Sequence, residues 1–155
     1  MSEEIRVKNT GLRGVTVADS AISFIDGEKG VLIYRGYRIE DLANRSSFME
    51  TAFLLLFGTL PSVEQLEGFT RQIKGMRAIP GYIIDSMRHW PKDARPMDVL
   101  QACVPMLSMD QQHSDTMDRD LCLQRSIGLL AQLPTLVAAW HRIRTNQPVL
   151  EPDAT

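Results

Sequence analysis

The stretch Arg119–Arg144 reads RDLCLQRSIGLLAQLPTLVAAWHRIR, and its apolar residues recur at the alternating steps of four and three expected for one face of an α-helix. One row along this face comprises Cys122, Ser126, Leu129, Leu133, Leu136, Trp140 and Ile143. A second row beside it comprises Leu123, Ile127, Leu130, Pro134 and Val137. Two adjacent rows make a stripe wider than a surface helix needs, so we expect this helix to be covered on more than one side. Pro134 removes one backbone donor and is expected to kink or loosen the helix.

The segments before the long helix also read as helices, which makes the predicted fold mainly α. Helices are expected around Ile39–Ala43 and over Phe48–Phe57, Val63–Arg77, Tyr82–His89 and Met97–Met109. Ser62 and Gln65 have the spacing of a capping box, and Pro96 suits the first position of a helix. Pro105 should distort the last of these helices, because proline costs about 3 kcal/mol in a regular helix interior.

The only β-like part of the sequence lies near its N-terminus. Ile22–Ile25 and Val31–Tyr34 are rich in β-branched and aromatic residues, and Asp26–Gly30 between them has the length and glycines of a hairpin loop. A small hairpin is therefore predicted over about residues 22–34. No Lys-Ser/Thr opening a helix follows these glycines, so a turn is preferred to a phosphate loop. Residues 1–10 are expected to form a flexible leader, and residues 149–155 a tail.

Composition describes an ordinary globular chain and excludes several functions. The 155 residues are 44% hydrophobic and 23% charged, with a formal net charge of −2. This balance gives no electrostatic reason to expect binding to nucleic acid or to an acidic membrane. The long helical segment is too rich in Arg and Gln to be read as a membrane span, and the charged N-terminus does not resemble a signal peptide. Cys103 and Cys122 lie in apolar helical rows, so we expect reduced, buried thiols in a cytoplasmic protein.

No catalytic, cofactor-binding or metal-binding residue is predicted from these patterns. The residue types that could carry such chemistry are His89, His113 and His141, the acidic loop residues Asp110, Asp115, Asp118 and Asp120, and also Arg142, Arg144, Met106 and Met109. The histidines are not at ligand spacing, and the acidic loop lacks the glycine and terminal glutamate of a calcium loop. We interpret its aspartates as a solvated connector that favours the start of the next helix, the arginines as matching a helix C-terminus, and the methionines as core or interface filler.

Three blocks of sequence resemble one known family. They are GLRGVTVADSAISFIDGEKGVLIYRGYRIEDLA at residues 11–43, SSFMETAFLLLFGTLPS at residues 46–62, and LLAQLPTLVAAWHRIRTNQP at residues 129–148. Together with the Pro96-Met97 opening of a helix, their order and spacing resemble bacterial and archaeal citrate synthases. The resemblance runs over residues 11–148 and implies the N-terminal part of the large domain of that mainly helical fold.

The resemblance carries specific functional expectations. The family condenses acetyl-CoA, its substrate, with oxaloacetate to give citrate and CoA, and its members act as homodimers. Segments similar to 97–109 and 119–144 form much of the dimer contact, which would explain a helix that is apolar on two sides. The Leu-Pro-Thr at residues 133–135 matches the family's own proline.

The same resemblance implies that the chain alone is inactive. The family's catalytic histidines and aspartate lie in motifs of the type His-Ala-x-His-Glu, Gly-x-x-His-Gly-Gly-Ala-Asn and Asp-Pro-Arg, and these motifs do not occur in this sequence. Two positions depart from the family pattern: Pro105, where relatives continue a regular helix, and Arg95, where many carry histidine.

We therefore expect the dimer-forming N-terminal portion of a citrate synthase whose partners are a second copy and the remainder of the enzyme. A 2-methylcitrate synthase, a citryl-CoA lyase, a non-enzymatic dimerisation module and one subunit of a split enzyme are the alternatives.

Overall fold

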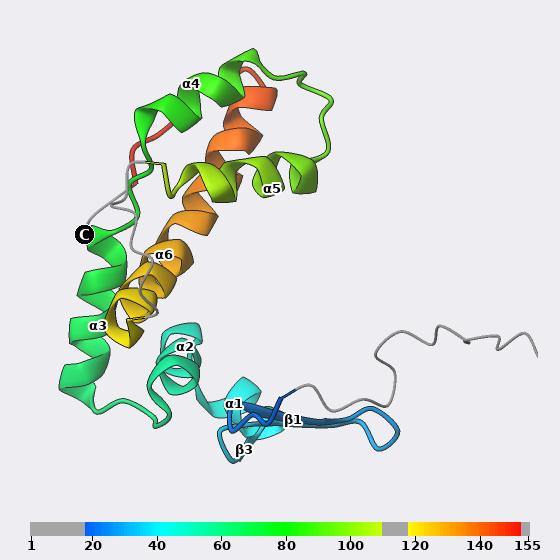
Figure 1. Cartoon of the computed structure of the whole chain (residues 1–155), viewed down its shortest axis with the longest axis vertical. Helices are drawn as coiled ribbons and strands as arrows, with labels where there is room; N and C mark the ends of the chain where they lie inside the picture. The colour runs from blue at the N-terminus through cyan, green and yellow to red at the C-terminus, as the bar shows by residue number, and fades with distance from the viewer. Residues whose placement is uncertain (1–17, 110–117, 153–155) are drawn as a thin grey trace, which may run out of the picture. The chain divides into compact units, whose positions relative to one another are not determined.

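A computed structural model describes residues 18–109 and 118–152 (Figure 1). The chain divides into two compact units, and the boundary between them in the sequence falls after Ser47. The first unit holds strands β1 (Ser23–Asp26), β2 (Val31–Tyr34) and β3 (Tyr37–Arg38) and helix α1 (Ile39–Arg45). The second unit holds α2 (Phe48–Phe57), α3 (Val63–Gly75), α4 (Gly81–His89), α5 (Pro96–Met106) and α6 (Arg119–Arg144). The prediction of a mainly α chain with a small N-terminal hairpin is confirmed.

The predicted hairpin is present and is extended by a third strand. β1 and β2 pair antiparallel, with Phe24 opposite Ile33, and Asp26 Oδ1 accepts the backbone N–H of Lys29 at 3.0 Å in the loop between them. β3 then adds to the free edge of β2 in the order β1-β2-β3. The turn into β3 places Arg35 and Gly36 at φ values of 48° and 92°, and positive φ at both central residues is the geometry that suits a tight hairpin turn. Glycine meets this requirement without a steric cost at Gly36.

Helix α3 begins as its sequence predicts. The Ser62 Oγ accepts the backbone N–H of Gln65 at 3.3 Å, and the Gln65 side-chain oxygen accepts the backbone N–H of Ser62 at 2.8 Å. These two bonds form the capping box and satisfy backbone donors that the helix itself cannot pair.

Helix α5 is shorter than expected. It ends at Met106, one residue after Pro105, whereas the sequence predicts a helix as far as Met109. Beyond this end, the backbone N–H of Leu107 is shared between the carbonyl oxygens of Cys103 and Val104, each at 3.2 Å. Pro105 has no backbone N–H to donate, so α5 lacks one helical hydrogen bond near its end. The distortion expected there is a last turn that includes a bond of the tighter 3₁₀ type, from Leu107 to Val104.

Helix α6 joins two separate hydrophobic cores within the second unit. Its N-terminal half packs Ile127 and Ala131 against α2 and α3, in a cluster that contains Phe53, Phe69 and Ile73. The rings of Phe53 and Phe69 meet edge to face with their centroids 5.5 Å apart. Figure 1 shows α6 continuing from this cluster to α4 and α5 at its C-terminal half.

The second core lies at that C-terminal half. Leu136, Ala139, Trp140 and Ile143 of α6 are buried there with residues of α4 and α5, including Met87 and Cys103. Burial therefore changes rows along the helix: the Ile127 row is covered in the first half, and the Leu136–Trp140 row in the second. We expected α6 to be covered on more than one side along its length. Instead, each half is covered on one side, by a different pair of helices, and its opposite side is open. The helix is continuous through Pro134.

The end of α6 is a Schellman motif centred on Asn146. The backbone N–H of Gln147 donates to the Arg142 carbonyl at 2.8 Å, that of Asn146 donates to the Ile143 carbonyl at 3.2 Å, and Asn146 has a φ of 57°.

We expect Asn146→Ala to lower the free energy of unfolding by about 1 kcal/mol, because a Cβ without a compensating polar group is disfavoured in the left-handed region. Asn146→Gly should not lower it. Urea denaturation of both variants measures the difference, and equal stability of the alanine and glycine variants would contradict this account.

Candidate interaction surface

The polar residues singled out in the sequence do not form a centre within the described residues 18–109 and 118–152. His89 Nδ1 lies 2.8 Å from the carbonyl oxygen of Asp85 in its own helix, and His141 is exposed. In that part of the chain the buried side chains are all apolar, and no group of three His, Cys, Asp or Glu residues has the arrangement of a metal site. His113, Asp110 and Asp115 lie outside the described residues, as do the proposed leader and the last three residues of the tail.

The end of the acidic loop that is described has the structural role expected of it. The Asp118 Oδ1 accepts the backbone N–H of Asp120 at 2.8 Å and that of Leu121 at 3.4 Å. Asp118 is thus the N-cap of α6, where a negative charge also interacts favourably with the helix dipole. Asp120 lies in the first turn, where the same dipole effect applies.

The C-terminal turn of α6 carries Arg142 and Arg144, as the sequence indicated. The Arg142 Nε also donates a hydrogen bond to the carbonyl oxygen of Pro148, and Val149 packs against the second core. The first residues of the predicted tail are therefore docked. Met106 packs against the same core and its carbonyl oxygen accepts the Tyr82 hydroxyl at 2.7 Å, whereas Met109 is exposed.

The two cysteines differ, which corrects the prediction that both are buried. Cys103 is fully buried in the second core, and burial raises the pKa of its thiol. Cys122 is exposed, because the first half of α6 buries the row that contains Ile127 instead.

This difference predicts the thiol reactivity of the folded chain. A maleimide at neutral pH should modify one thiol per chain rapidly, at Cys122, and the second only after denaturation. The raised pKa keeps Cys103 protonated at neutral pH, and the thiolate is the reactive form. Intact-mass analysis over time, with Cys122→Ser as the control, checks the assignment. Rapid double labelling of the folded protein would contradict the buried position of Cys103.

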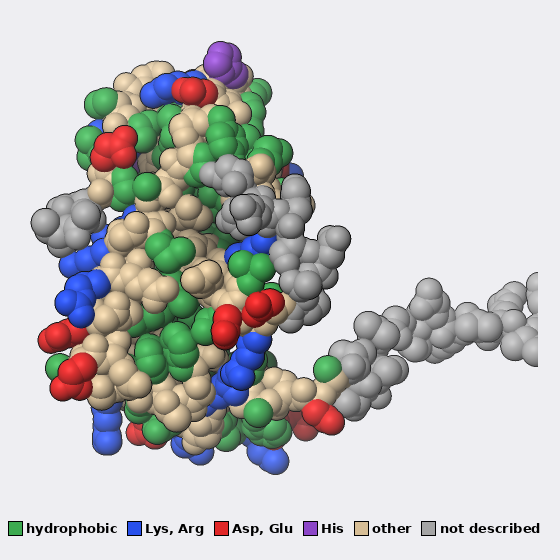
Figure 2. Space-filling model, turned by 60° about the vertical axis from the view of Figure 1, so that its left-hand side comes forward, with side chains coloured by type: hydrophobic (Ala, Val, Ile, Leu, Met, Phe, Trp, Pro, Cys, Tyr) green, Lys and Arg blue, Asp and Glu red, His purple; other side chains and the backbone are tan. Residues whose placement is uncertain are grey.

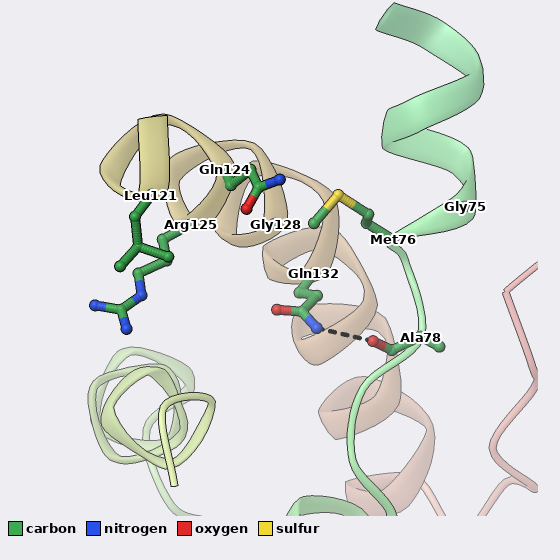
Figure 3. Close-up of a pocket in the computed structure, with 8 residues that line it drawn as sticks. All are labelled: Gly75, Met76, Ala78, Leu121, Gln124, Arg125, Gly128 and Gln132. Atoms are coloured by element: carbon green, nitrogen blue, oxygen red, sulfur yellow. Dashed lines mark hydrogen bonds between the residues drawn. The ribbon is translucent and has the colours of Figure 1, made fainter. Parts of the chain in front are cut away.

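One pocket lies where α6 approaches the end of α3 (Figure 3). It encloses about 490 Å³ and is lined by Gly75, Met76, Ala78, Leu121, Gln124, Arg125, Gly128 and Gln132. The Gln132 Nε2 donates to the Ala78 carbonyl at 2.9 Å, which ties α6 to the segment after α3. A Cβ at Gly128 would lie 3.1 Å from Met76 Cε, the end of a flexible side chain, so the Met76 side chain packs directly over this glycine. Figure 3 shows the Arg125 side chain extending away from Gln132, so the polar groups of this pocket do not converge.

A larger and more apolar hollow follows the C-terminal half of α6. It encloses about 1010 Å³, and we call it the α6 groove. Its apolar lining comprises Phe48, Leu130, Leu133, Pro134, Val137, Ala138, Ala139, Leu150 and Pro152. Its polar lining comprises Arg77, Thr135, His141, Arg142 and Glu151. Val137 is 54% exposed, Phe48 69% and Leu150 61%, so large apolar side chains of this groove face solvent. Exposed hydrophobic side chains are also visible at several places on the face drawn in Figure 2.

The exposed apolar side of α6 bears on how the helix is used. By length and composition alone α6 is apolar enough to cross a membrane, which does not agree with the expectation drawn from its Arg and Gln content. The same property is found in core helices of soluble proteins, so it is weak evidence for a membrane span. A contiguous apolar surface next to polar residues is typical of an interface with another protein surface. The α6 groove is therefore the candidate functional site.

Solved structures share this arrangement of helices. The chain superposes on a citrate synthase from Thermotoga maritima with a TM-score of 0.80 and 30% sequence identity, over 96% of this chain and 38% of that one. A citrate synthase from Thermoplasma acidophilum gives a TM-score of 0.85 over 98% of this chain, at 24% identity, which shows the fold alone.

Sequence comparison defines the family. The family model described as citrate synthase, C-terminal domain, matches residues 11–155. A citrate synthase from Synechocystis is 39% identical over 153 residues, which cover 99% of this chain and 38% of that protein. A 2-methylcitrate synthase from Shewanella oneidensis is 34% identical over 143 residues, covering 92% of this chain and 37% of that protein. The chain belongs to the citrate synthase family, and it spans less than half the length of these relatives.

Proposed function

We propose that this chain is the N-terminal, dimer-forming portion of a cytoplasmic citrate synthase, which condenses acetyl-CoA, oxaloacetate and water to citrate and CoA. The observation that carries the proposal is the match of residues 11–155 to the family model together with the 39% identity to the Synechocystis enzyme. On this proposal no residue of this segment binds a cofactor, and acetyl-CoA is a substrate of the complete enzyme.

The catalytic residues would come from outside these 155 residues. The condensation needs a base that removes a proton from the acetyl methyl group, and donors that stabilise the oxyanion charge that develops. His89 is bonded to its own helix backbone, and His141 is exposed beside an apolar groove. Neither lies in a sequence motif of the type that carries catalysis in the family. On this proposal the chain alone is inactive, and the remaining part of the enzyme supplies the reacting groups.

The role in dimer formation is supported by the α6 groove. Its apolar side chains are exposed, and the side of α6 that carries Val137 is left uncovered by the described part of this chain. A second copy related by a two-fold axis would bring two such surfaces together, as an isologous interface requires. The contact would be built from α6 and α5. The structure gives α5 the range 96–106, whereas the sequence predicts 97–109.

A 2-methylcitrate synthase is the second candidate, favoured by the 34% identity to the Shewanella oneidensis enzyme. The two reactions differ in the acyl group of the thioester, and the present residues do not contact it on this proposal. The discrimination would therefore lie in residues outside this chain.

The experiment is to isolate the natural polypeptide with an antibody to this segment, measure its intact mass, and assay it. We expect a mass more than twice the 17.5 kDa of this chain, and citrate formation from acetyl-CoA and oxaloacetate. The recombinant 155-residue chain should release no CoA under the same conditions. A preference for propionyl-CoA would favour 2-methylcitrate synthase. A natural mass near 17.5 kDa would contradict a single longer enzyme, and a co-purifying chain would then identify a split enzyme.

A further inference from the structure

The α6 groove carries two opposite charges that have no ion-pair partner within the described part of the chain. Arg142 and Glu151 both line the groove, where Glu151 is exposed and Arg142 is half-buried. The ion pairs found among the described residues involve other side chains. Arg77 also lines the groove, but it already takes part in another interaction. The groove therefore presents one cation and one anion that a partner can complement.

The Arg142 guanidinium group is held in place by the segment that follows α6. Its Nε donates a hydrogen bond to the Pro148 carbonyl, and Val149 packs against the second core. This bond uses one guanidinium N–H and leaves those of the two terminal nitrogens, which have the spacing to bind both oxygens of a carboxylate. Arg142 also continues a row of groove residues at steps of four along α6, comprising Leu130, Pro134 and Ala138. The fixed cation thus belongs to the same surface as the exposed apolar side chains.

Glu151 has no better cation within its own chain. It also borders a smaller hollow of about 250 Å³ that contains Asp85 and Arg88 of α4. The Arg88 Nη1 lies 2.7 Å from the Asp85 Oδ1, so the charge of Arg88 is already balanced within α4. Arg142 of the same chain is not within ion-pair distance of Glu151 in the part of the chain that the structure describes. The Glu151 carboxylate is therefore left for a cation that another molecule brings to the groove.

A second copy of this chain would complement both charges at once. In an isologous interface each contact between two different residues occurs twice, once on either side of the two-fold axis. Closing the groove without pairing these groups would remove a guanidinium and a carboxylate from water in each subunit, which is costly. We propose that Glu151 of each subunit forms an ion pair with Arg142 of the partner subunit. This inference rests on the proposed dimer through the α6 groove, and it assigns the residues that select a second copy as the partner.

Charge reversal at the two positions tests the pairing. The natural polypeptide is prepared as Glu151→Lys and, with ¹⁵N labelling, as Arg142→Glu. Each variant alone would bring two like-charge contacts across its two-fold axis, so its dimer dissociation constant should rise about tenfold. In a heterodimer the introduced lysine faces the introduced glutamate, and the native Glu151 faces the native Arg142. Native mass spectrometry of an equilibrated, equal mixture should therefore show heterodimer well above the half expected from random association.

The matched control is the pair Glu151→Gln and Arg142→Gln, which introduces no repulsion and should associate at random. Random association of the two charge-reversed variants would overturn the ion pair and leave the proposed dimer intact. A parent protein that stays monomeric at every concentration would overturn the dimer itself, and the pairing with it.

Arg142→Glu also changes the contact with Pro148, so its thermal unfolding is compared with that of the parent. If that variant does not fold, Glu151→Lys and Glu151→Gln carry the test by sedimentation velocity. Lysine should weaken the dimer severalfold more than glutamine at low ionic strength, and the difference should shrink at high ionic strength because salt screens the repulsion. Equal dissociation constants for these two variants would overturn the proposal.

Discussion

Replacing Leu136 with alanine is expected to lower the free energy of unfolding by about 2–5 kcal/mol. Leu136 is 1% exposed and belongs to the core in which α6 meets α4 and α5, beside Met87 and Trp140. Removing its isobutyl group forfeits hydrophobic burial and enlarges a hollow of about 140 Å³ that Leu136 lines together with Met87 and Trp140. Collapse around the new space is limited by the large rings of Trp90 and Trp140, so we expect a value in the upper half of this range.

The matched control is Leu129→Ala in the same helix. Leu129 is 36% exposed and lies outside both cores, so its truncation should cost less than about 1 kcal/mol. Urea denaturation followed by circular dichroism measures both, with the midpoint shift interpreted only where the slope is unchanged. Equal destabilisation by the two substitutions would show that the assigned burial along α6 is wrong.

The helices were predictable because each has its own local signals. Ser62 and Gln65 specify the start of α3, Pro96 the start of α5, and the periodicity of residues 119–144 the whole of α6. β3 was missed because two residues, Tyr37 and Arg38, carry no recognisable alternation. The signal that was available is Gly36, which permits a tight turn immediately after β2.

The burial of individual residues on α6 was less predictable, for a tertiary reason. Regular rows place Cys122 and Trp140 on one face, yet Cys122 is exposed and Trp140 buried. Two hydrophobic clusters pack against different sides of α6. The periodicity of one helix indicates which residues share a face, but it does not indicate where α2 and α4 lie. The doubled apolar row did indicate an apolar side beyond the core, but the location of the α6 groove depends on which neighbours are present.

The site could be predicted only by resemblance. Residue types and spacing predict no catalytic or metal-binding group in this sequence. The resemblance to the family gives a reason, because the motifs that carry catalysis in that family do not occur in this sequence.

The second large effect is expected at Val137, a residue of α6 that lines the α6 groove and is 54% exposed. Val137→Lys should raise the dissociation constant of the proposed dimer at least about a hundredfold, which corresponds to about 2.8 kcal/mol. A two-fold interface would bury one such ammonium group from each subunit among apolar side chains, beside a groove lining in which Arg77 and Arg142 already outnumber the acidic Glu151. In the monomer the long side chain can extend into water, so the stability of the fold should change little.

The measurement is sedimentation velocity of the natural polypeptide and its Val137→Lys variant over a range of concentrations. Leu129→Lys is the control: it introduces the same charge on the same helix, at a residue that does not line the α6 groove. We expect the Val137 variant to sediment as a monomer where the parent and the Leu129 variant sediment as dimers. Dimers of equal affinity in all three proteins would place the subunit contact elsewhere.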